Sequence, residues 1–321
     1  MSLLKVNNLK KYFPVNNGLL SRIKGDVDYV HAVNDVSFQI KKGETLSLVG
    51  ESGCGKSTTG RTILGLYEPT DGNIIFGGKN LNKLKPEEQF EYRQKMQMIF
   101  QDPYSSLNPR MKVKDIINEP VKTHNLVDKN EREDYILELL DKVGLDGSYI
   151  NRYPHQFSGG QRQRVGIART LAMQPEFVVA DEPISSLDVS IQAQILNLLM
   201  DLQEEYDLTF LFIAHDLSVV KHISDRIAIM YLGEICEIGE TNELFQNPMH
   251  PYTKALFASI PQLTTESRAE FDALQGDVPN PINLPQGCNF HSRCKQASEI
   301  CKEVKPTLEN IDGRKVACHF V

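Results

Sequence analysis

Short apolar runs separated by helix-like stretches recur along most of the chain. The runs that we interpret as strands lie at residues 46–49, 74–76, 98–100, 177–180 and 210–214. Strands that alternate with helices are typical of a largely parallel sheet with helices packed on its faces. The pattern therefore predicts an α/β fold.

Three segments depart from this pattern. Apolar residues alternate with polar ones at positions 33, 36, 38 and 40, which predicts an antiparallel β subdomain near the start. At about residues 102–170 the apolar residues recur at helical spacing instead, which predicts a helical subdomain. After residue 239, repeated prolines interrupt any regular pattern. We therefore expect a main domain at residues 1–260 and an extension with little core of its own at 261–321.

Composition narrows the class of protein. The 321 residues include 35 basic and 42 acidic side chains, a formal net charge of −7. This balance argues against nucleic acid as a partner and favours protein partners. The apolar runs are far shorter than the roughly 20 residues that span a bilayer, and the N-terminus lacks the apolar core of a secretory signal. We expect a soluble intracellular chain whose cysteines stay reduced.

A glycine-rich loop follows the apolar run at 46–49 and precedes a helical pattern. Its sequence, Gly-Glu-Ser-Gly-Cys-Gly-Lys-Ser at 50–57, is a complete P-loop. Backbone N–H groups of such a loop point at the α- and β-phosphates, Lys56 reaches the β- and γ-phosphates, and Ser57 offers its hydroxyl to Mg²⁺. The predicted nucleotide-binding residues here are Glu51, Ser52, Gly53, Cys54, Gly55, Lys56, Ser57 and Thr58.

Cys54 lies inside this loop. A helix N-terminus and the neighbouring Lys56 both favour the thiolate, although the side chain should point away from the phosphates. We therefore expect alkylation of Cys54 to block ATP binding and ATP to protect it.

Two carboxylates, Asp181 and Glu182, end a buried apolar strand. A charge there is costly unless it binds a cation or takes part in chemistry. We predict that Asp181 holds Mg²⁺ through water and that Glu182 polarises the attacking water.

A second anion-binding turn lies far from the P-loop. Ser158-Gly159-Gly160-Gln161 opens a helix whose free N–H groups and positive dipole end face any anion in front of it. One nucleotide would then face two such helix starts, so we infer that they serve two nucleotides across a dimer.

These motifs, in this order, resemble the ATP-binding subunit of ABC transporters over residues 1 to about 260. The resemblance implies that Ser158, Gly159, Gly160 and Gln161 of one subunit close over the γ-phosphate held by the P-loop of the other. It also implies that Gln101 bridges Mg²⁺ and water to the membrane partner, that Asp188 lies in the loop crossing the dimer interface, and that His215 holds the γ-phosphate. Adenine should stack on an aromatic residue near the N-terminus, where Phe13 fits best by register and Tyr12 is the alternative.

Four of the six cysteines cluster near the C-terminus, at Cys288, Cys294, Cys301 and Cys318. Four thiols in a loop-rich segment suggest one tetrahedral cage, and the chemistry of the donors leaves Zn²⁺ and an iron–sulfur cluster both open. Pro279-Asn280-Pro281 and the segment 287–294 resemble the C-terminal signature of oligopeptide and dipeptide importer ATPases. That resemblance implies a [4Fe-4S] cluster on these four cysteines.

The resemblance also implies partners. The segment Pro14 to His31 is similar to the second of the two ATPases in such importers, which implies a heterodimer with another ABC ATPase. Two integral-membrane permeases and an extracellular solute-binding protein would complete the complex, with this chain peripheral on the cytoplasmic face of the membrane. The alternative is a non-transport ABC ATPase that acts on ribosomes or DNA.

Overall fold

The computed structural model describes residues 2–15, 28–258 and 276–321. Two compact units make up the chain. Unit 1 combines Met1–Lys41, Thr45–Asn82 and Ile213–Val321, and unit 2 combines Lys42–Glu44 and Lys83–Phe212. Among the residues described, no helix is both long and apolar enough to cross a membrane.

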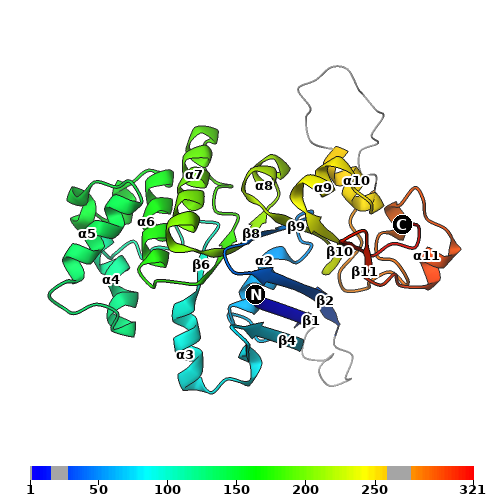
Figure 1. The fold of residues 1–321 in the computed structure, drawn as a ribbon, viewed down its shortest axis with the longest axis horizontal. Helices are drawn as coiled ribbons and strands as arrows, with labels where there is room; N and C mark the ends of the chain where they lie inside the picture. Colours follow the sequence, from blue (N-terminus) through cyan, green and yellow to red (C-terminus); the bar gives the residue numbers. More distant parts are fainter. Residues whose placement is uncertain (1, 16–27, 259–275) are drawn as a thin grey trace. The chain divides into compact units, whose positions relative to one another are not determined.

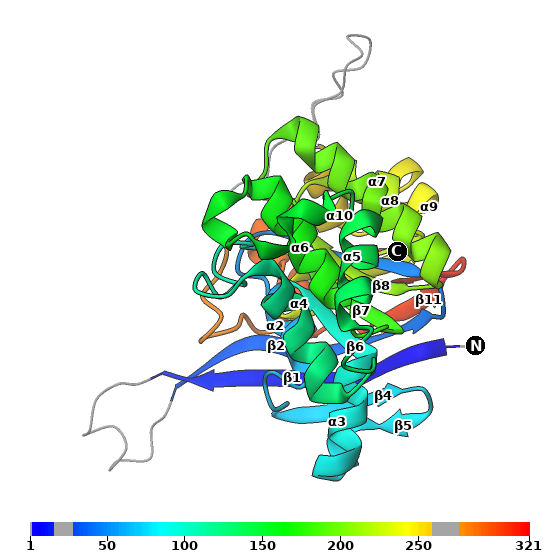
Figure 2. The same cartoon turned by 90° about the vertical axis from the view of Figure 1, so that its left-hand side faces the viewer.

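Unit 1 contains a four-stranded antiparallel sheet with the order β2-β1-β4-β5 (Figures 1 and 2). Its strands are β1 (Ser2–Pro14), β2 (Tyr29–Lys41), β4 (Asp71–Phe76) and β5 (Lys79–Asn80). Val33, Val36 and Ile40 are fully buried, so the predicted antiparallel strand is confirmed.

The apolar run at 74–76 was expected in the parallel sheet, but it pairs antiparallel with β1 instead. Gly77 and Gly78, both with positive φ, join β4 to β5 in a tight hairpin. Such a turn favours antiparallel pairing, whereas an apolar run alone does not encode the direction of its neighbours.

A second set of strands in unit 1 follows the order β11-β12-β10-β9-β3. The strands are β3 (Thr45–Val49), β9 (Arg226–Tyr231), β10 (Glu234–Glu240), β11 (Glu309–Ile311) and β12 (Arg314–Val316). β3 and β9 are parallel, and the remaining pairs are antiparallel. The helices of this unit are α2 (Lys56–Ile63), α8 (Leu217–Ile223), α9 (Thr241–Gln246), α10 (Pro251–Ala258) and α11 (Glu299–Glu303).

The C-terminal residues are therefore part of a sheet. β12 pairs with β10 through Val316 and Lys315, and Val316 is buried. Phe290 and Cys301 are buried as well. The predicted boundary between residues 260 and 261 lies outside the described residues and stays a prediction.

Unit 2 contains the strand order β8-β7-β6 and five α-helices in its described residues. Its elements are α3 (Pro86–Lys95), β6 (Met96–Ile99), α4 (Val113–His124), α5 (Arg132–Lys142), α6 (Gly159–Leu171), β7 (Phe177–Asp181), α7 (Val189–Tyr206) and most of β8 (Thr209–Ala214). β6 and β7 are parallel and buried, as the apolar runs predict. Figures 1 and 2 both show α4, α5 and α6 side by side, within the segment where helical spacing was recognised.

Candidate functional site

The P-loop of unit 1 joins the fully buried strand β3 to α2, which begins at Lys56. Two of its glycines are required by close packing. A Cβ at Gly55 would lie 2.0 Å from the carbonyl oxygen of Ala32, and one at Gly50 would lie 2.1 Å from that of Met230. Gly55 also has a φ of 103°, a backbone conformation that residues with a side chain rarely adopt. Neighbouring backbone thus fixes the course of the loop.

The Lys56 side chain folds back over this loop. Its Nζ donates hydrogen bonds to the carbonyl oxygens of Gly50 (2.8 Å) and Glu51 (3.0 Å), and the residue is 5% exposed. The loop therefore holds a buried cation against its own backbone, an arrangement that offers positive charge to an incoming phosphate.

Cys54 differs from expectation. The residue is 2% exposed, and burial raises the pKa of its thiol even though the Lys56 ammonium acts in the opposite direction. The inference from the helix start and Lys56 alone was therefore wrong on the thiolate, because the cost of burying a charge is the larger effect.

Sequence reasoning missed the partners of Glu51. Arg293 makes two hydrogen bonds to this carboxylate, and Tyr252 accepts the backbone N–H of Glu51. No pattern in the sequence joins positions so distant, although the basic residue before Cys294 was part of the recognised C-terminal signature.

The two candidate adenine-stacking residues occupy different surroundings. Phe13 makes an edge contact with Tyr67 (5.3 Å between ring centroids) and lies under the Lys11 ammonium. The ring of Tyr12 instead lies against that of His31 at a tilt (4.2 Å between ring centroids), and its hydroxyl donates to Asn34 at 2.7 Å. Both rings thus have neighbours in the same unit, and the choice of Phe13 over Tyr12 stays a prediction.

His215 directly follows β8 and is exposed. The next residue, Asp216, caps α8 by accepting the N–H of Ser218 at 2.8 Å. This cap fixes the turn that carries the histidine.

In unit 2, two carboxylates end β7 as expected. Asp181 is fully buried, and Glu182 follows with a φ of 47°. A left-handed conformation costs a non-glycine residue about 1 kcal/mol or more and is concentrated at functional sites. The side-chain amide of Gln101 donates to Glu182 Oε2 at 2.8 Å, so the structure brings these two predicted residues together.

The turn at Ser158 opens α6 with a reciprocal cap. Ser158 Oγ accepts the N–H of Gln161, and Gln161 Oε1 accepts the N–H of Ser158. A Cβ at Gly160 would lie 2.4 Å from Cγ2 of Ile191, on α7. The glycine is therefore required by packing as well as by any contact with an anion.

Asp188 precedes α7 and is exposed. The next residue, Val189, is 81% exposed. A single exposed apolar side chain is common on protein surfaces, so this exposure does not by itself identify an interface.

The four C-terminal cysteines share one neighbourhood. Burial raises the pKa of Cys288 to about 11, and the thiols of Cys301, Cys294 and Cys318 add to that shift. The backbone N–H of Cys288 also donates to the carbonyl oxygen of Cys301 at 2.8 Å. Nevertheless, in the described ranges no three His, Cys, Asp or Glu side chains converge closely enough to hold a metal ion.

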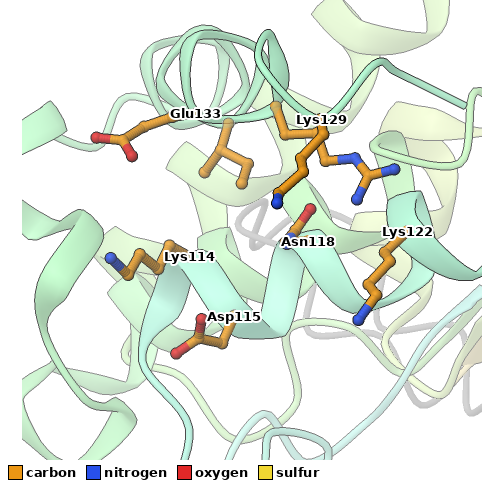
Figure 3. Close-up of a pocket in the computed structure, with 8 residues that line it drawn as sticks. Lys114, Asp115, Asn118, Lys122, Lys129 and Glu133 are labelled. Atoms are coloured by element: carbon orange, nitrogen blue, oxygen red, sulfur yellow. The ribbon is translucent and has the colours of Figure 1, made fainter. Parts of the chain in front are cut away.

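Unit 2 also contains a cavity of about 520 Å³ formed by α4, α5 and the loop between them (Figure 3). Its lining residues are Lys114, Asp115, Asn118, Lys122, Lys129, Arg132, Glu133 and Ile136. None of them belongs to the predicted ATP site, so this cavity is a separate feature.

The predicted residues are thus divided between the units. Unit 1 carries Phe13, the P-loop, His215 and the four C-terminal cysteines, and unit 2 carries Gln101, residues 158–161, Asp181, Glu182 and Asp188.

Two parts of the chain match known families. Residues 33–185 match the family described as ABC transporter. Residues 236–301 match the family described as oligopeptide/dipeptide transporter, C-terminal region.

Relatives match over nearly the whole chain. The oligopeptide transport ATP-binding protein AppF of Bacillus subtilis is 52% identical over 99% of this chain and 97% of its own length. The dipeptide transport ATP-binding protein DppF of Escherichia coli is 46% identical over 99% and 94%. Among solved structures, the dimeric post-hydrolysis state of the ATP-binding cassette MJ0796, bound to ADP and Pi, is similar with a TM-score of 0.65. That cassette is 30% identical over 74% of this chain and 98% of its own.

Proposed function

Since the chain belongs to the ATP-binding proteins of the ABC transporter family, we propose that it hydrolyses ATP to drive uptake of oligopeptides or dipeptides. The observation that carries this proposal is the extent of the match. Similarity to AppF and DppF covers 99% of the chain and includes the C-terminal region. These relatives give no support to the alternative, an ABC ATPase that acts on ribosomes or DNA.

ABC ATPases use ATP and Mg²⁺, and the residues present suit both. The hydroxyl of Ser57 and the carboxylate of Asp181 are the oxygen ligands that Mg²⁺ prefers, and bound Mg²⁺ neutralises charge on the β- and γ-phosphates. Lys56 would exchange its bonds to the loop carbonyls for bonds to phosphate oxygens. Backbone N–H groups of residues 53–58 would bind the remaining oxygens, and Phe13 would stack on adenine.

Hydrolysis requires a base near the attacking water. Glu182 takes this role in our proposal, because its carboxylate is held by the amide of Gln101 at 2.8 Å. Gln101 would orient the carboxylate and Mg²⁺, and His215 would hold the γ-phosphate.

The second anion-binding turn requires a partner. We infer that residues 158–161 of one ATPase close over the γ-phosphate bound to the P-loop of another, with Asp188 and the exposed Val189 at the interface. The dimeric cassette MJ0796, 30% identical, supports such an assembly. Pairing with a second, different ATPase is suggested by the segment 14–31, most of which lies outside the described residues.

The remaining partners follow from the proposed transport. Two membrane permeases would receive the motion of the dimer through residues 101–111, and an extracellular solute-binding protein would deliver the peptide. The chain would then be peripheral, on the cytoplasmic face of the membrane.

A [4Fe-4S] cluster on Cys288, Cys294, Cys301 and Cys318, or Zn²⁺ in its place, is a further proposal. The donor set supports it, since four thiols within mutual electrostatic reach suit either species. The described geometry does not, because no three of these side chains converge as ligands. Iron and labile sulfide in anaerobically purified protein would support the cluster, whereas zinc alone would overturn it.

Uptake in cells tests the proposed function. A strain that lacks this gene should lose ATP-dependent uptake of labelled oligopeptides, and the wild-type gene should restore it. Glu182→Gln should bind ATP without restoring uptake, whereas Glu204→Gln, a matched change at an exposed residue of α7, should restore it fully. Unchanged peptide uptake in the deletion strain would overturn the proposal.

A further inference from the structure

We call the segment that contains the four C-terminal cysteines, residues 288–318, the C-terminal cysteine segment. It contacts the P-loop directly, through Arg293 and Glu51. Arg293 ends a short 3-10 helix (His291–Arg293) and immediately precedes Cys294. Its Nη1 donates to Glu51 Oε2 at 2.7 Å and its Nη2 donates to Glu51 Oε1 at 3.1 Å. This two-pronged geometry is the strongest form of an arginine–carboxylate pair.

Burial distinguishes this pair from an ordinary surface ion pair. The Arg293 side chain is 5% exposed and that of Glu51 is 25% exposed. Charges so shielded from water interact more strongly than exposed ones, and removing one partner leaves the other uncompensated.

Aromatic residues hold Arg293 in place. Its Nη1 also lies 3.4 Å from the hydroxyl of Tyr231, and Tyr231 packs against Tyr252 and Phe290. All three rings are buried. The guanidinium is therefore fixed before any ligand arrives.

Glu51 is fixed on its backbone side as well. Its N–H donates to the hydroxyl of Tyr252 at 3.0 Å, and its carbonyl oxygen accepts the ammonium of Lys56 at 3.0 Å. The residue that begins the turn of the P-loop is thus held at its side chain, its N–H and its carbonyl group.

We propose that Arg293 is a positioning residue for the ATPase: it fixes the P-loop through Glu51 and neutralises a carboxylate that would otherwise repel the polyphosphate of ATP. The C-terminal cysteine segment thereby sets the affinity of the nucleotide site. This inference rests on the proposed function, in which residues 50–57 bind ATP.

The first test is a double-mutant cycle on the full chain, with the Kd for a fluorescent ATP analogue as the readout. Arg293→Ala should raise this Kd about tenfold or more, because Glu51 becomes an unpaired negative charge in the phosphate-binding loop. In a Glu51→Gln background the same change should raise the Kd only about twofold. Lys315→Ala, an exposed cation in the same C-terminal segment, is the matched control and should leave the Kd unchanged.

Kinetics separate positioning from a general structural role. Arg293→Ala should raise the KM for ATP by a factor similar to the Kd while kcat stays within about twofold. Arg293→Lys keeps the charge but loses the second hydrogen bond, so its Kd should rise only about threefold. This conservative variant also serves if Arg293→Ala does not fold.

Three results would overturn the inference. They are a wild-type Kd in both Arg293 variants, an equal loss of affinity in the Glu51→Gln background, and a fall in kcat without a change in KM. A wild-type chain that binds no ATP would instead overturn the proposed function, and this inference with it.

Discussion

The side-chain amide of Gln101 donates a hydrogen bond to the carboxylate of Glu182. Gln101 follows strand β6, whereas Glu182 follows strand β7. β6 and β7 run parallel, and their last paired residues are Ile99 and Ala180. Gln101 and Glu182 each follow two positions later, so the register of the sheet brings them to the same edge. The 2.8 Å hydrogen bond is therefore a consequence of parallel pairing.

Replacing Gln101 tests whether this hydrogen bond matters for hydrolysis. Gln101→Ala should lower kcat about tenfold and leave the KM for ATP within about twofold, because the amide orients Glu182 and does not bind the nucleotide's base or ribose. Steady-state ATPase measurements give both constants. Gln97→Ala, on β6 itself, is the control and should change neither. A full kcat in Gln101→Ala would mean that Glu182 is oriented by other contacts.

The packing of Gly160 against Ile191 permits a separation of stability from catalysis. Gly160→Ala should lower the free energy of unfolding by about 1–3 kcal/mol, since a Cβ would meet Ile191 Cγ2 at 2.4 Å. Adding Ile191→Ala removes the obstructing atom and should recover part of that loss. Urea denaturation measures both.

ATPase activity then reports on the second role of Gly160. If the glycine also approaches a γ-phosphate, the double variant should stay impaired in hydrolysis despite its recovered stability. Full recovery of activity with stability would show that Gly160 is required for packing alone.

Sequence reasoning succeeded where a short segment determines its own geometry. The P-loop motif at 50–57, the cap at Ser158 and the carboxylates of Asp181 and Glu182 are all recognised from local pattern, and the structure places each at a boundary of the expected element. Reasoning failed where distant segments meet. Arg293 and Glu51 are separated by 242 positions, and the pairing of β12 with β10 follows no turn signal. Contacts of this kind depend on the whole fold, which no local pattern encodes.

The pKa of Cys54 also depends on the whole fold, which no local pattern encodes. Its neighbours in sequence favour the thiolate, but burial raises the pKa of the thiol. Alkylation by N-ethylmaleimide should therefore be slower at Cys54 than at a free cysteine of a model peptide at pH 7.5, and its rate should still be rising at pH 9. Mass spectrometry of the peptide that contains Cys54 gives the rate. A rate that levels off below pH 8 would indicate a lowered pKa and would restore the original expectation.

His250 provides a pH-dependent contribution to stability. The residue is 2% exposed, and burial lowers the pKa of its imidazole to about 4. Its Nδ1 accepts the N–H of Tyr252 at 3.0 Å, so the folded state holds the neutral ring. The backbone N–H of His250 donates to Glu237 Oε2 at 2.9 Å, which holds the backbone of this residue in place.

The sign of the effect follows from the lowered pKa. At pH 7 the imidazole is mostly neutral in both states. As the pH falls below about 6.5, the unfolded chain binds a proton that the folded chain does not, so the folded state loses stability. The loss continues to about pH 4 and is complete below that value. Between pH 7 and pH 5 it amounts to about 2 kcal/mol.

Substituting His250 should remove this dependence. His250→Asn keeps an acceptor for the Tyr252 N–H but cannot titrate, so the variant should lose about 2 kcal/mol less than wild type between pH 7 and pH 5 in urea denaturation. His222→Asn changes an exposed histidine on α8 and should keep the wild-type difference. Because Glu237 also contacts this segment, the comparison is made between variants at each pH. An identical loss of stability in His250→Asn and wild type would place the titrating group elsewhere.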